Sequence, residues 1–395
     1  MASIRTWIGG AAAAVVVAGA AYVASDFTLL ARYATYDGDP MTAGVDWYQP
    51  KDPVIGANRG ELPAADRPTI DAAALDAAAA FAAAQKSSSL IVVRRGAIER
   101  EVYWNGATRE TWFNPQSMSK TVLALMVGEA IADGHIAAVD DTLGKYIAEW
   151  RDDPRGAITI RQALWMATGL EQMAPDNETR FLSRGVRYNF GSDFVGHLLT
   201  LRQVEPAGTR FDYNNEVTNL LGLVVERASK RRYVDYLSAK IWQPLGLADA
   251  AMYLDRPGGV VMKSCCIFSR PIDWARIGLM IKDRGVWNDR PVVPSAWIDE
   301  MTAPSPHAAH YGYQVWLGSG YLRLEDQTRP DGTVRKKNAS EPYDDPDMIV
   351  LNGYGNQRVW ISRAHDLVIV RGADAWAPAW DDTFIPNTLI RGIRE

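Results

Sequence analysis

The middle of the chain carries apolar residues at a helical period. After Lys120, apolar side chains recur at intervals of three and four residues as far as Ile131, and Gly134 then gives a typical C-terminal stop. Similar patterns predict further helices over 69–85, 158–170, 216–242 (two helices) and 271–285. We therefore expect the middle third of the chain to be helical.

Strand-like runs lie on both sides of this helical part. The stretch 89–104 is rich in β-branched residues and predicts two strands around Arg95-Gly96. Four later runs follow one another with short gaps, over 311–319, 347–355, 357–364 and 367–373. Strands that do not alternate regularly with helices favour an antiparallel sheet. The prediction is an α+β fold, in which an antiparallel β-sheet flanked by helices carries an inserted all-helical subdomain.

The amino terminus differs from the rest of the chain. Residues 8–24 contain no charged side chain, and this length approaches that needed to cross a bilayer. We expect residues 1–24 to be a signal peptide or a membrane anchor, or alternatively a buried Ala-rich helix. Either export interpretation places the remainder outside the cytoplasm, as a periplasmic, secreted or inner-membrane-anchored protein.

The remaining sequence divides by composition. Residues 25–68 are rich in Gly, Pro and Asp and predict a linker or wrapping segment. Residues 69–395 form the main domain, with a helical subdomain over about 120–262. The sheet subdomain combines 69–119 with 263–395.

Composition narrows the choice of function. The net charge of −5 is dispersed along the 395 residues, so we expect no nucleic-acid partner. No metal-ligand spacing occurs among the five histidines, and we predict neither a metal nor a cofactor. The two cysteines, Cys265 and Cys266, are adjacent and cannot join distant segments. We interpret them as buried thiols, with lining of a cleft or a vicinal disulfide as alternatives.

The stretch "NPQSMSK" presents a candidate nucleophile. Ser117 and Lys120 are three residues apart at a helix start, so they share a face. A serine attacks only when a base takes its proton, and a lysine can act as that base when burial favours its neutral form. The helix start also directs N–H groups at a developing oxyanion. Alone, the spacing is weak evidence and is more typical of a capping serine than of a nucleophile.

A second motif, "PAGTRFDYNNE", supplies further polar groups. The phenol of Tyr213 can relay a proton, and the amide of Asn215 can hold a substrate carbonyl or orient the lysine. The alternative is that Asn215 caps the following helix and Tyr213 packs on it.

The order of these motifs, with "ITIRQALWMATGL", "IWQPLGL" and "DWARIGLM", resembles the serine β-lactamase and penicillin-recognising superfamily. The likeness covers roughly 88–371. It is strongest to the class C-like branch, which includes D-alanyl-D-alanine peptidases, esterases and 6-aminohexanoate-dimer hydrolases. The resemblance implies an antiparallel sheet with a helical subdomain and a site between them.

The resemblance also implies roles for individual residues. Ser117 matches the acylated nucleophile, Lys120 its general base, Tyr213 the proton shuttle and Asn215 the Y-x-N asparagine. The second oxyanion donor is expected in 352–361, where we predict Gln357. In addition, "KSCCIFSRPIDWARIG" matches a segment that passes the cleft, which makes Cys266 a candidate lining residue.

One departure from the family shapes the expected activity. This chain has no K-T-G motif, whose lysine in the family positions the carboxylate of β-lactam substrates. We therefore expect a serine hydrolase acting on a small amide or ester, including linear 6-aminohexanoate-type oligomers. The alternatives are a β-lactamase or D-alanyl-D-alanine carboxypeptidase, and, from another class, a non-catalytic envelope binding protein.

Overall fold

The computed structural model describes residues 26–39, 43–173, 183–328 and 332–394. The predicted leader, residues 1–24, lies outside the described residues. Among the helices that are described, none has the length and apolar character needed to cross a membrane. The strands are β1 (Lys51–Val54), β2 (Ser87–Arg94), β3 (Ala97–Tyr103), β4 (Ala250–Tyr253), β5 (Ile267–Phe268), β6 (Val286–Trp287), β7 (Arg290–Pro291), β8 (Trp316–Leu317), β9 (Gln327–Thr328), β10 (Val334–Arg335), β11 (Ile349–Gly353), β12 (Gln357–Ser362) and β13 (Leu367–Ala373).

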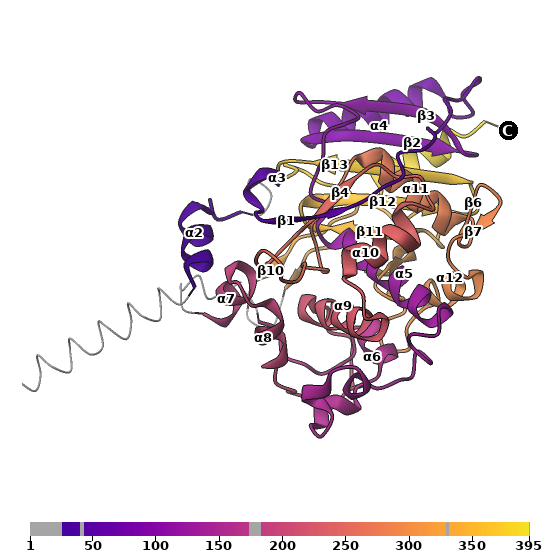
Figure 1. Ribbon diagram of the computed structural model, residues 1–395. Coiled ribbons are helices and arrows are strands. Elements are labelled where there is room, and N and C mark those ends of the chain that lie inside the picture. Colours follow the sequence, from indigo (N-terminus) through magenta and orange to yellow (C-terminus); the bar gives the residue numbers. More distant parts are fainter. Residues whose placement is uncertain (1–25, 40–42, 174–182, 329–331, 395) are drawn as a thin grey trace, which may run out of the picture.

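The helices are α2 (Phe27–Thr35), α3 (Gly44–Trp47), α4 (Ala72–Ala84), α5 (Ser119–Ala132), α6 (Ile160–Leu164), α7 (Arg184–Phe190), α8 (Phe194–Leu199), α9 (Asn215–Ser229), α10 (Tyr233–Leu237), α11 (Pro271–Lys282), α12 (Ser295–Met301) and α13 (Phe384–Arg391). In Figure 1, α6, α8 and α9 lie below the main sheet, whereas α4 lies beside β2 and β3 at the top. A 3₁₀ turn, η1 (Gln116–Met118), precedes α5, and a second, η7 (Tyr354–Asn356), joins β11 to β12.

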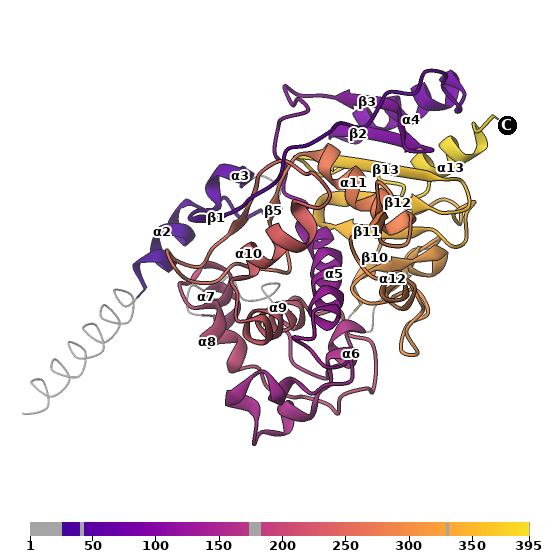
Figure 2. The same cartoon turned by 45° about the vertical axis from the view of Figure 1, so that its right-hand side comes forward.

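The main sheet has six antiparallel strands in the order β3-β2-β13-β12-β11-β8. Its centre pairs an early strand with the last one, since Val92 of β2 lies opposite Ile369 of β13. The helices α4 and α13 cover one face, and α11 lies against the other (Figures 1 and 2). The predicted α+β class with an antiparallel sheet built from both ends of the chain is confirmed.

Side chains of β2 alternate between these two faces, as the period of a strand requires. Leu90 and Val92 pack in the cluster that includes α4 and α13, whereas Ile91 and Val93 pack in the cluster on the α11 side. All eight residues of the strand are buried because both faces are covered.

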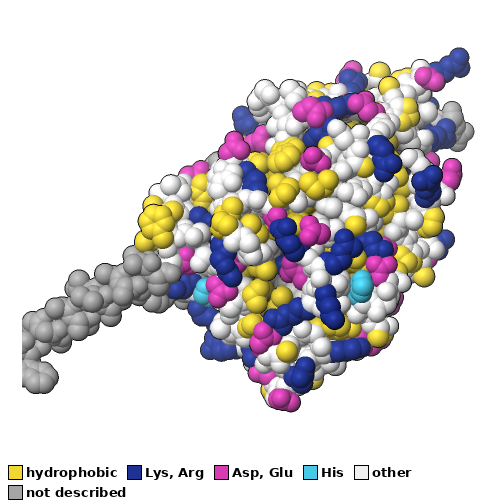
Figure 3. All heavy atoms as spheres, in the orientation of Figure 1, with side chains coloured by type: hydrophobic (Ala, Val, Ile, Leu, Met, Phe, Trp, Pro, Cys, Tyr) yellow, Lys and Arg dark blue, Asp and Glu magenta, His cyan; other side chains and the backbone are white. Residues whose placement is uncertain are grey.

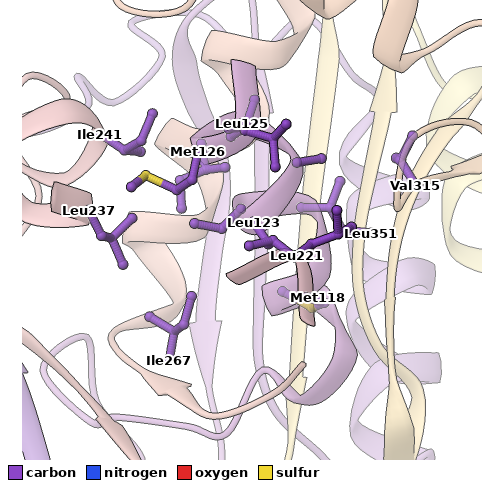
Figure 4. Close-up of a cluster of buried hydrophobic side chains, with 14 of the residues drawn as sticks. Met118, Leu123, Leu125, Met126, Leu221, Leu237, Ile241, Ile267, Val315 and Leu351 are labelled. Atoms are coloured by element: carbon purple, nitrogen blue, oxygen red, sulfur yellow. The ribbon is translucent and has the colours of Figure 1, made fainter. Parts of the chain in front are cut away.

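Helix α5 runs through the centre of the molecule. Every residue from Ser119 to Ala130 is buried, so the helix carries no solvated face. Its side chains Leu123 and Met126 pack among residues of other elements, including Leu221 of α9 and Ile267 of β5 (Figure 4). This burial places the start of α5, where the sequence predicts the nucleophile, on a rigid support.

The segment predicted as a linker or wrap contains regular structure. It includes α2, α3 and β1, and β1 pairs with β4 in a separate three-stranded sheet of order β1-β4-β5. Within 120–262, predicted as all-helical, β4 is a strand. On the face shown in Figure 3, acidic and basic side chains are interspersed, in keeping with the small net charge.

Candidate active site

Ser117 lies in η1, immediately before the buried helix α5. Its side chain is partly exposed, whereas Met118, Ser119 and Lys120 are buried. The N-cap position of α5 is Met118, and no side chain caps this helix. The hydroxyl of Ser117 therefore does not cap α5, but lies at the helix end where the backbone dipole favours negative charge.

The backbone before Ser117 adopts an uncommon conformation. Gln116 has φ of +52°, in the left-handed region that non-glycine residues seldom occupy. Such backbone strain tends to occur at functional sites. Here it forms the turn that presents Ser117 at the start of α5.

The ammonium group of Lys120 contacts three oxygen atoms. Its Nζ donates to Ser117 Oγ at 3.1 Å, to Asn215 Oδ1 at 2.7 Å and to the main-chain oxygen of Ser264 at 3.0 Å. The lysine itself is 1% exposed. Lys120 and Asn215, which are 95 positions apart in the sequence, thus lie in one cluster.

Burial changes the acid–base behaviour of Lys120. Desolvation lowers its pKa from 10.5 to about 7, and the carboxylate of Glu216 acts in the opposite direction. A lysine in this range has a substantial neutral fraction at pH 7 and can accept a proton. Glu216, buried beside the cluster, was not singled out from the sequence, because an acidic residue in the first turn of a helix is commonplace.

Two consecutive asparagines at the start of α9 make different contacts. Asn214 caps the helix, with its Oδ1 accepting from the N–H groups of Glu216 and Val217 at 2.9 and 3.2 Å. The alternative in which Asn215 caps α9 is therefore wrong by one position. Asn215 is exposed except where its oxygen holds Lys120, so its amide borders both the lysine and solvent.

Tyr213 also contacts the serine. Burial raises the pKa of its phenol to about 12, and a hydrogen bond with Ser117 partly opposes this shift. The Nζ of Lys120 is 5.0 Å from the centre of the Tyr213 ring. The phenol thus stays protonated at neutral pH and is positioned to exchange a proton with the serine.

Tyr213 belongs to a cluster of aromatic side chains. The rings of Trp316 and Tyr311 lie 5.5 and 6.1 Å from the Tyr213 ring, and Phe211 contacts both of these neighbours. No sequence motif indicates this cluster, because its members come from segments about a hundred residues apart.

Gln357 is the first residue of β12 and is 1% exposed. Its side chain exchanges two hydrogen bonds with the backbone of Ala373, at 2.6 and 2.9 Å, which braces the end of β13. Gly353, at the end of β11, closely approaches the serine segment, because an added Cβ there would meet the Pro115 oxygen at 2.3 Å. The side chain of Gln357 is thus not part of the Lys120 cluster, and its predicted backbone role stays a prediction.

Cys265 and Cys266 form a disulfide bond with each other. The interpretation of these residues as buried thiols is therefore wrong, and the vicinal alternative is correct. Cys266 has φ of +74° and is buried, whereas Cys265 is partly exposed. The pair directly follows Ser264, whose oxygen accepts from Lys120, so Cys266 borders the cluster through the backbone. A main-chain ligand such as Ser264 leaves no signal in a sequence.

Two further observations concern the second serine of the motif and possible metal ligands. Ser119 is fully buried and its hydroxyl has no partner, in keeping with a packing role. Over the described ranges, no group of three or more His, Cys, Asp or Glu side chains is arranged to hold a metal ion.

Comparisons with known proteins bear on the family and the fold of the chain. A family model described as Beta-lactamase matches residues 75–383, more than half of the chain. The 6-aminohexanoate-dimer hydrolase of Paenarthrobacter ureafaciens is 27% identical over 228 residues, which are 55% of this chain and 57% of that protein. The match thus spans little more than half the length of this relative.

Solved structures share the fold at low identity. A proposed 6-aminohexanoate-dimer hydrolase from Bacillus anthracis has a TM-score of 0.68 and 18% identity, covering 90% of this chain and 93% of its own. A proposed β-lactamase from Bacteroides dorei has a TM-score of 0.64 and 19% identity, covering 83% and 100%. Because both identities are low, these likenesses bear on the fold alone.

Proposed function

The chain belongs to the β-lactamase family and is a serine hydrolase, and on this premise we propose that it cleaves a small amide or ester through an acyl-enzyme on Ser117. The observation that carries the proposal is the contact of 3.1 Å between Lys120 Nζ and Ser117 Oγ. The lysine at this contact has its pKa lowered to about 7 by burial, which gives the serine a base able to work at neutral pH.

In the proposed acylation, Ser117 Oγ attacks the substrate carbonyl while Lys120 takes the hydroxyl proton. The oxyanion that forms is held by the N–H of Ser117 and by a second main-chain N–H. Gln357 is the predicted second donor, and the end of β11 is an alternative, because Gly353 closely approaches Pro115. Such donors aimed at an oxyanion are worth about 10²–10³ in kcat.

The tetrahedral intermediate then collapses and the leaving group takes a proton. Tyr213, hydrogen-bonded to Ser117 and close to Lys120, is placed to pass that proton to the departing amine or alcohol. Water then attacks the acyl-enzyme along the reverse proton route, and the acid departs. Asn215, which holds Lys120 and also faces solvent, is placed to bind the substrate carbonyl group or its neighbouring amide.

For the substrate we propose small linear amides or esters, including 6-aminohexanoate-type oligomers. The support is the partial match to a 6-aminohexanoate-dimer hydrolase and the absence of a K-T-G lysine from the sequence. β-Lactam hydrolysis and D-alanyl-D-alanine carboxypeptidase activity are the alternatives that the same family allows.

The test of the proposal is covalent labelling. The folded full-length protein is incubated with a fluorophosphonate, and the modified peptide is identified by mass spectrometry. We expect one adduct on Ser117, none in Ser117→Ala, and full labelling in Ser119→Ala, which removes the buried hydroxyl two residues away. Folded protein that gains no adduct on Ser117 contradicts the acyl-enzyme.

The substrate class requires a parallel assay. Turnover is compared for a p-nitrophenyl ester, a linear aminohexanoate dimer and a chromogenic cephalosporin. We expect turnover of the ester or the linear amide to exceed that of the cephalosporin. Rapid hydrolysis of the cephalosporin alone would leave the acyl-enzyme in place but overturn the proposed substrate class.

We also propose that the chain is exported, to the periplasm or beyond, by residues 8–24. The bond between Cys265 and Cys266 supports this proposal, because disulfides persist mainly in oxidising compartments. Fractionation of the native host tests it: recovery of the protein in the cytosol with both thiols free would contradict export.

A further inference from the structure

The turn formed by residues 263–266 carries one of the three oxygens that hold Lys120. The main-chain oxygen of Ser264 accepts from Lys120 Nζ at 3.0 Å, in a fully buried contact. A carbonyl can hold a lysine in one place only when the peptide that bears it is fixed. The groups that fix this turn therefore bear on where the lysine nitrogen lies.

The side-chain amide of Asn219 makes several hydrogen bonds to this turn. Asn219 Oδ1 accepts from the N–H groups of Lys263 and Ser264 at 2.7 and 3.1 Å. Its Nδ2 donates to Ser264 Oγ at 3.0 Å. Asn219 is 4% exposed, so water offers little competition for these bonds.

The same amide also reaches the second oxygen ligand of the lysine. Its Nδ2 donates to the main-chain oxygen of Asn215 at 3.1 Å and to the hydroxyl of Tyr188. Asn215 supplies Oδ1 to Lys120 from one turn earlier on α9. Asn219 thus contacts both residues, Asn215 and Ser264, whose oxygens hold the lysine from outside its own helix.

The face of α9 that packs against residues 263–266 also accommodates the side chain of Lys263. Gly222, one turn beyond Asn219, leaves room for the stem of Lys263, since an added Cβ would lie 2.7 Å from its side-chain carbons. Glu226, one turn further, pairs with Lys263 Nζ at 2.8 Å. Asn219, Gly222 and Glu226 are spaced by three and four positions and therefore share one helix face. This face of α9 forms a continuous contact surface for the turn.

From these contacts we propose that Asn219 is a positioning residue, which holds the Ser264 carbonyl and the start of α9 so that Lys120 Nζ stays within reach of Ser117 Oγ. The inference rests on the proposed function, in which Lys120 is the base. Asn219 itself touches neither Ser117 nor the substrate carbonyl. Its effect is on the geometry of the base, where misplacement by about 1 Å can cost on the order of 10²-fold in rate.

The experiment compares Asn219→Leu with Thr218→Val in the full chain. Leucine has a similar size but makes none of the amide bonds. Thr218 is the preceding residue of α9, is fully buried and donates to Gln314 Oε1 at 2.7 Å, so its variant loses a buried hydrogen bond on a different face. Tyr213 and Glu216 face Lys120 from the start of α9 and are unaltered in both variants.

For ester hydrolysis, Asn219→Leu is expected to lower kcat about 10- to 100-fold with KM changed less than about twofold. The acid limb of its pH profile should move to higher pH, because a loosened turn admits water and relieves the desolvation of Lys120. Thr218→Val should keep the profile and kcat of the unaltered protein despite a comparable loss of stability. Asn219→Ser, which retains one polar group, should give an intermediate kcat and serves if the leucine variant does not fold.

Either of two kinetic results would overturn the inference. One is a folded Asn219 variant whose kcat and pH profile match those of the unaltered protein. The other is an equal loss of kcat in the Asn219 and Thr218 variants with no displacement of the pH profile, which would indicate general destabilisation. Fluorophosphonate labelling separates the two proposals: failure of Ser117 labelling in the unaltered protein contradicts the function itself, whereas normal labelling in Asn219→Leu contradicts only the positioning role.

Discussion

Lys120 is the residue at which stability and chemistry conflict most directly. Burying its amine favours the neutral form that catalysis needs, and this penalises the protonated form that water would otherwise favour. The three oxygens around Nζ reduce the penalty, because each accepts a hydrogen bond from the amine. Asn215 and Ser264 therefore keep the lysine in place in either protonation state.

Activity should depend on pH through this lysine. Because protonated Lys120 cannot accept the proton of Ser117, kcat/KM is expected to fall about tenfold per pH unit below about pH 7 and to level off above it. The measurement is ester hydrolysis from about pH 5 to 9, corrected for spontaneous hydrolysis, with circular dichroism as a check that the protein stays folded. A profile that is flat across pH 7 would contradict a base with this pKa.

The same shift in pKa links protonation to folding. The folded pKa of Lys120 is about 7 and the reference value is 10.5, so between these limits the unfolded chain binds more protons than the folded one. Stability therefore rises with pH across this window as far as this group is concerned, and the full penalty is present below pH 7. The pH range over which this lysine changes the stability of the fold, above about pH 7, therefore lies above the range in which its protonation inactivates the site.

Tyr213 provides a separate test of proton transfer. Replacing it by phenylalanine keeps the ring among its aromatic neighbours but removes the hydroxyl that bonds Ser117. We expect kcat to fall by roughly 10²–10⁴, the range for a lost general acid or base, with little change in KM. The matched control is Tyr233→Phe, which removes a buried hydroxyl that has no partner, and should leave kcat unaltered. Equal kcat values for the two variants would remove Tyr213 from the mechanism.

Among the secondary-structure elements, α9 determines how the site is assembled. Its cap at Asn214 fixes where the helix begins, and this sets the directions of Tyr213 before the cap and Asn215 after it. The amide of Asn214 also donates to the carbonyl groups of Leu170 and Glu171, at 3.3 and 3.1 Å. The cap therefore joins the start of α9 to the segment that follows α6.

Loss of this cap should affect both stability and activity. Asn214→Ala is expected to cost about 1 kcal/mol of unfolding free energy, as for other N-caps, and to lower kcat because Asn215 and Tyr213 lose their fixed directions. Thr159→Ala removes the capping box of α6 at a similar cost. Chemical denaturation and ester hydrolysis measure the two effects. The expectation fails if both variants lose stability equally and both keep full kcat.

Element positions followed from the sequence better than contacts between elements. The helical period over 121–134 and the paired strands around Arg95-Gly96 are features of neighbouring residues, and α5, β2 and β3 occur there. Burial of α5 on all sides did not follow, because it depends on what the rest of the chain places around it.

The candidate site also combines residues that local motifs predict with contacts that depend on how distant segments pack. Ser117, Lys120, Tyr213 and Asn215 carry family motifs, and the structure brings them together. The approach of Gly353 to Pro115 depends on how β11 meets η1, which no local pattern encodes. For the same reason the sequence indicated neither the Ser264 carbonyl nor Asn219, since their roles arise only when the 263–266 turn packs on α9.

For the whole molecule, the sheet joins segments from both ends of the chain around one buried arginine. Arg371 of β13 is fully buried and donates to Gln85 O at 2.7 Å and Ser87 Oγ at 2.8 Å, which lie before and at the start of β2. It also donates to the main-chain oxygens of Gly355 and Asn356 at 2.9 and 2.8 Å. One guanidinium thus ties the early strands to the turn that follows Gly353 at the candidate site.

This arrangement predicts that two arginine variants differ widely in stability. Arg371→Met leaves the buried oxygens of Gln85 and Gly355, and the partly buried oxygen of Asn356, without this donor. A buried acceptor left without a partner costs about 1–3 kcal/mol, so we expect a loss of more than about 3 kcal/mol in unfolding free energy. Arg391→Met removes ion pairs from a side chain that is 55% exposed, where solvent screens the charges, so the unfolding free energy should change little. Urea unfolding with linear extrapolation measures both. A loss for Arg371→Met as small as that for Arg391→Met would mean that the two ends of the chain are held together by strand pairing and apolar packing, with little contribution from the guanidinium.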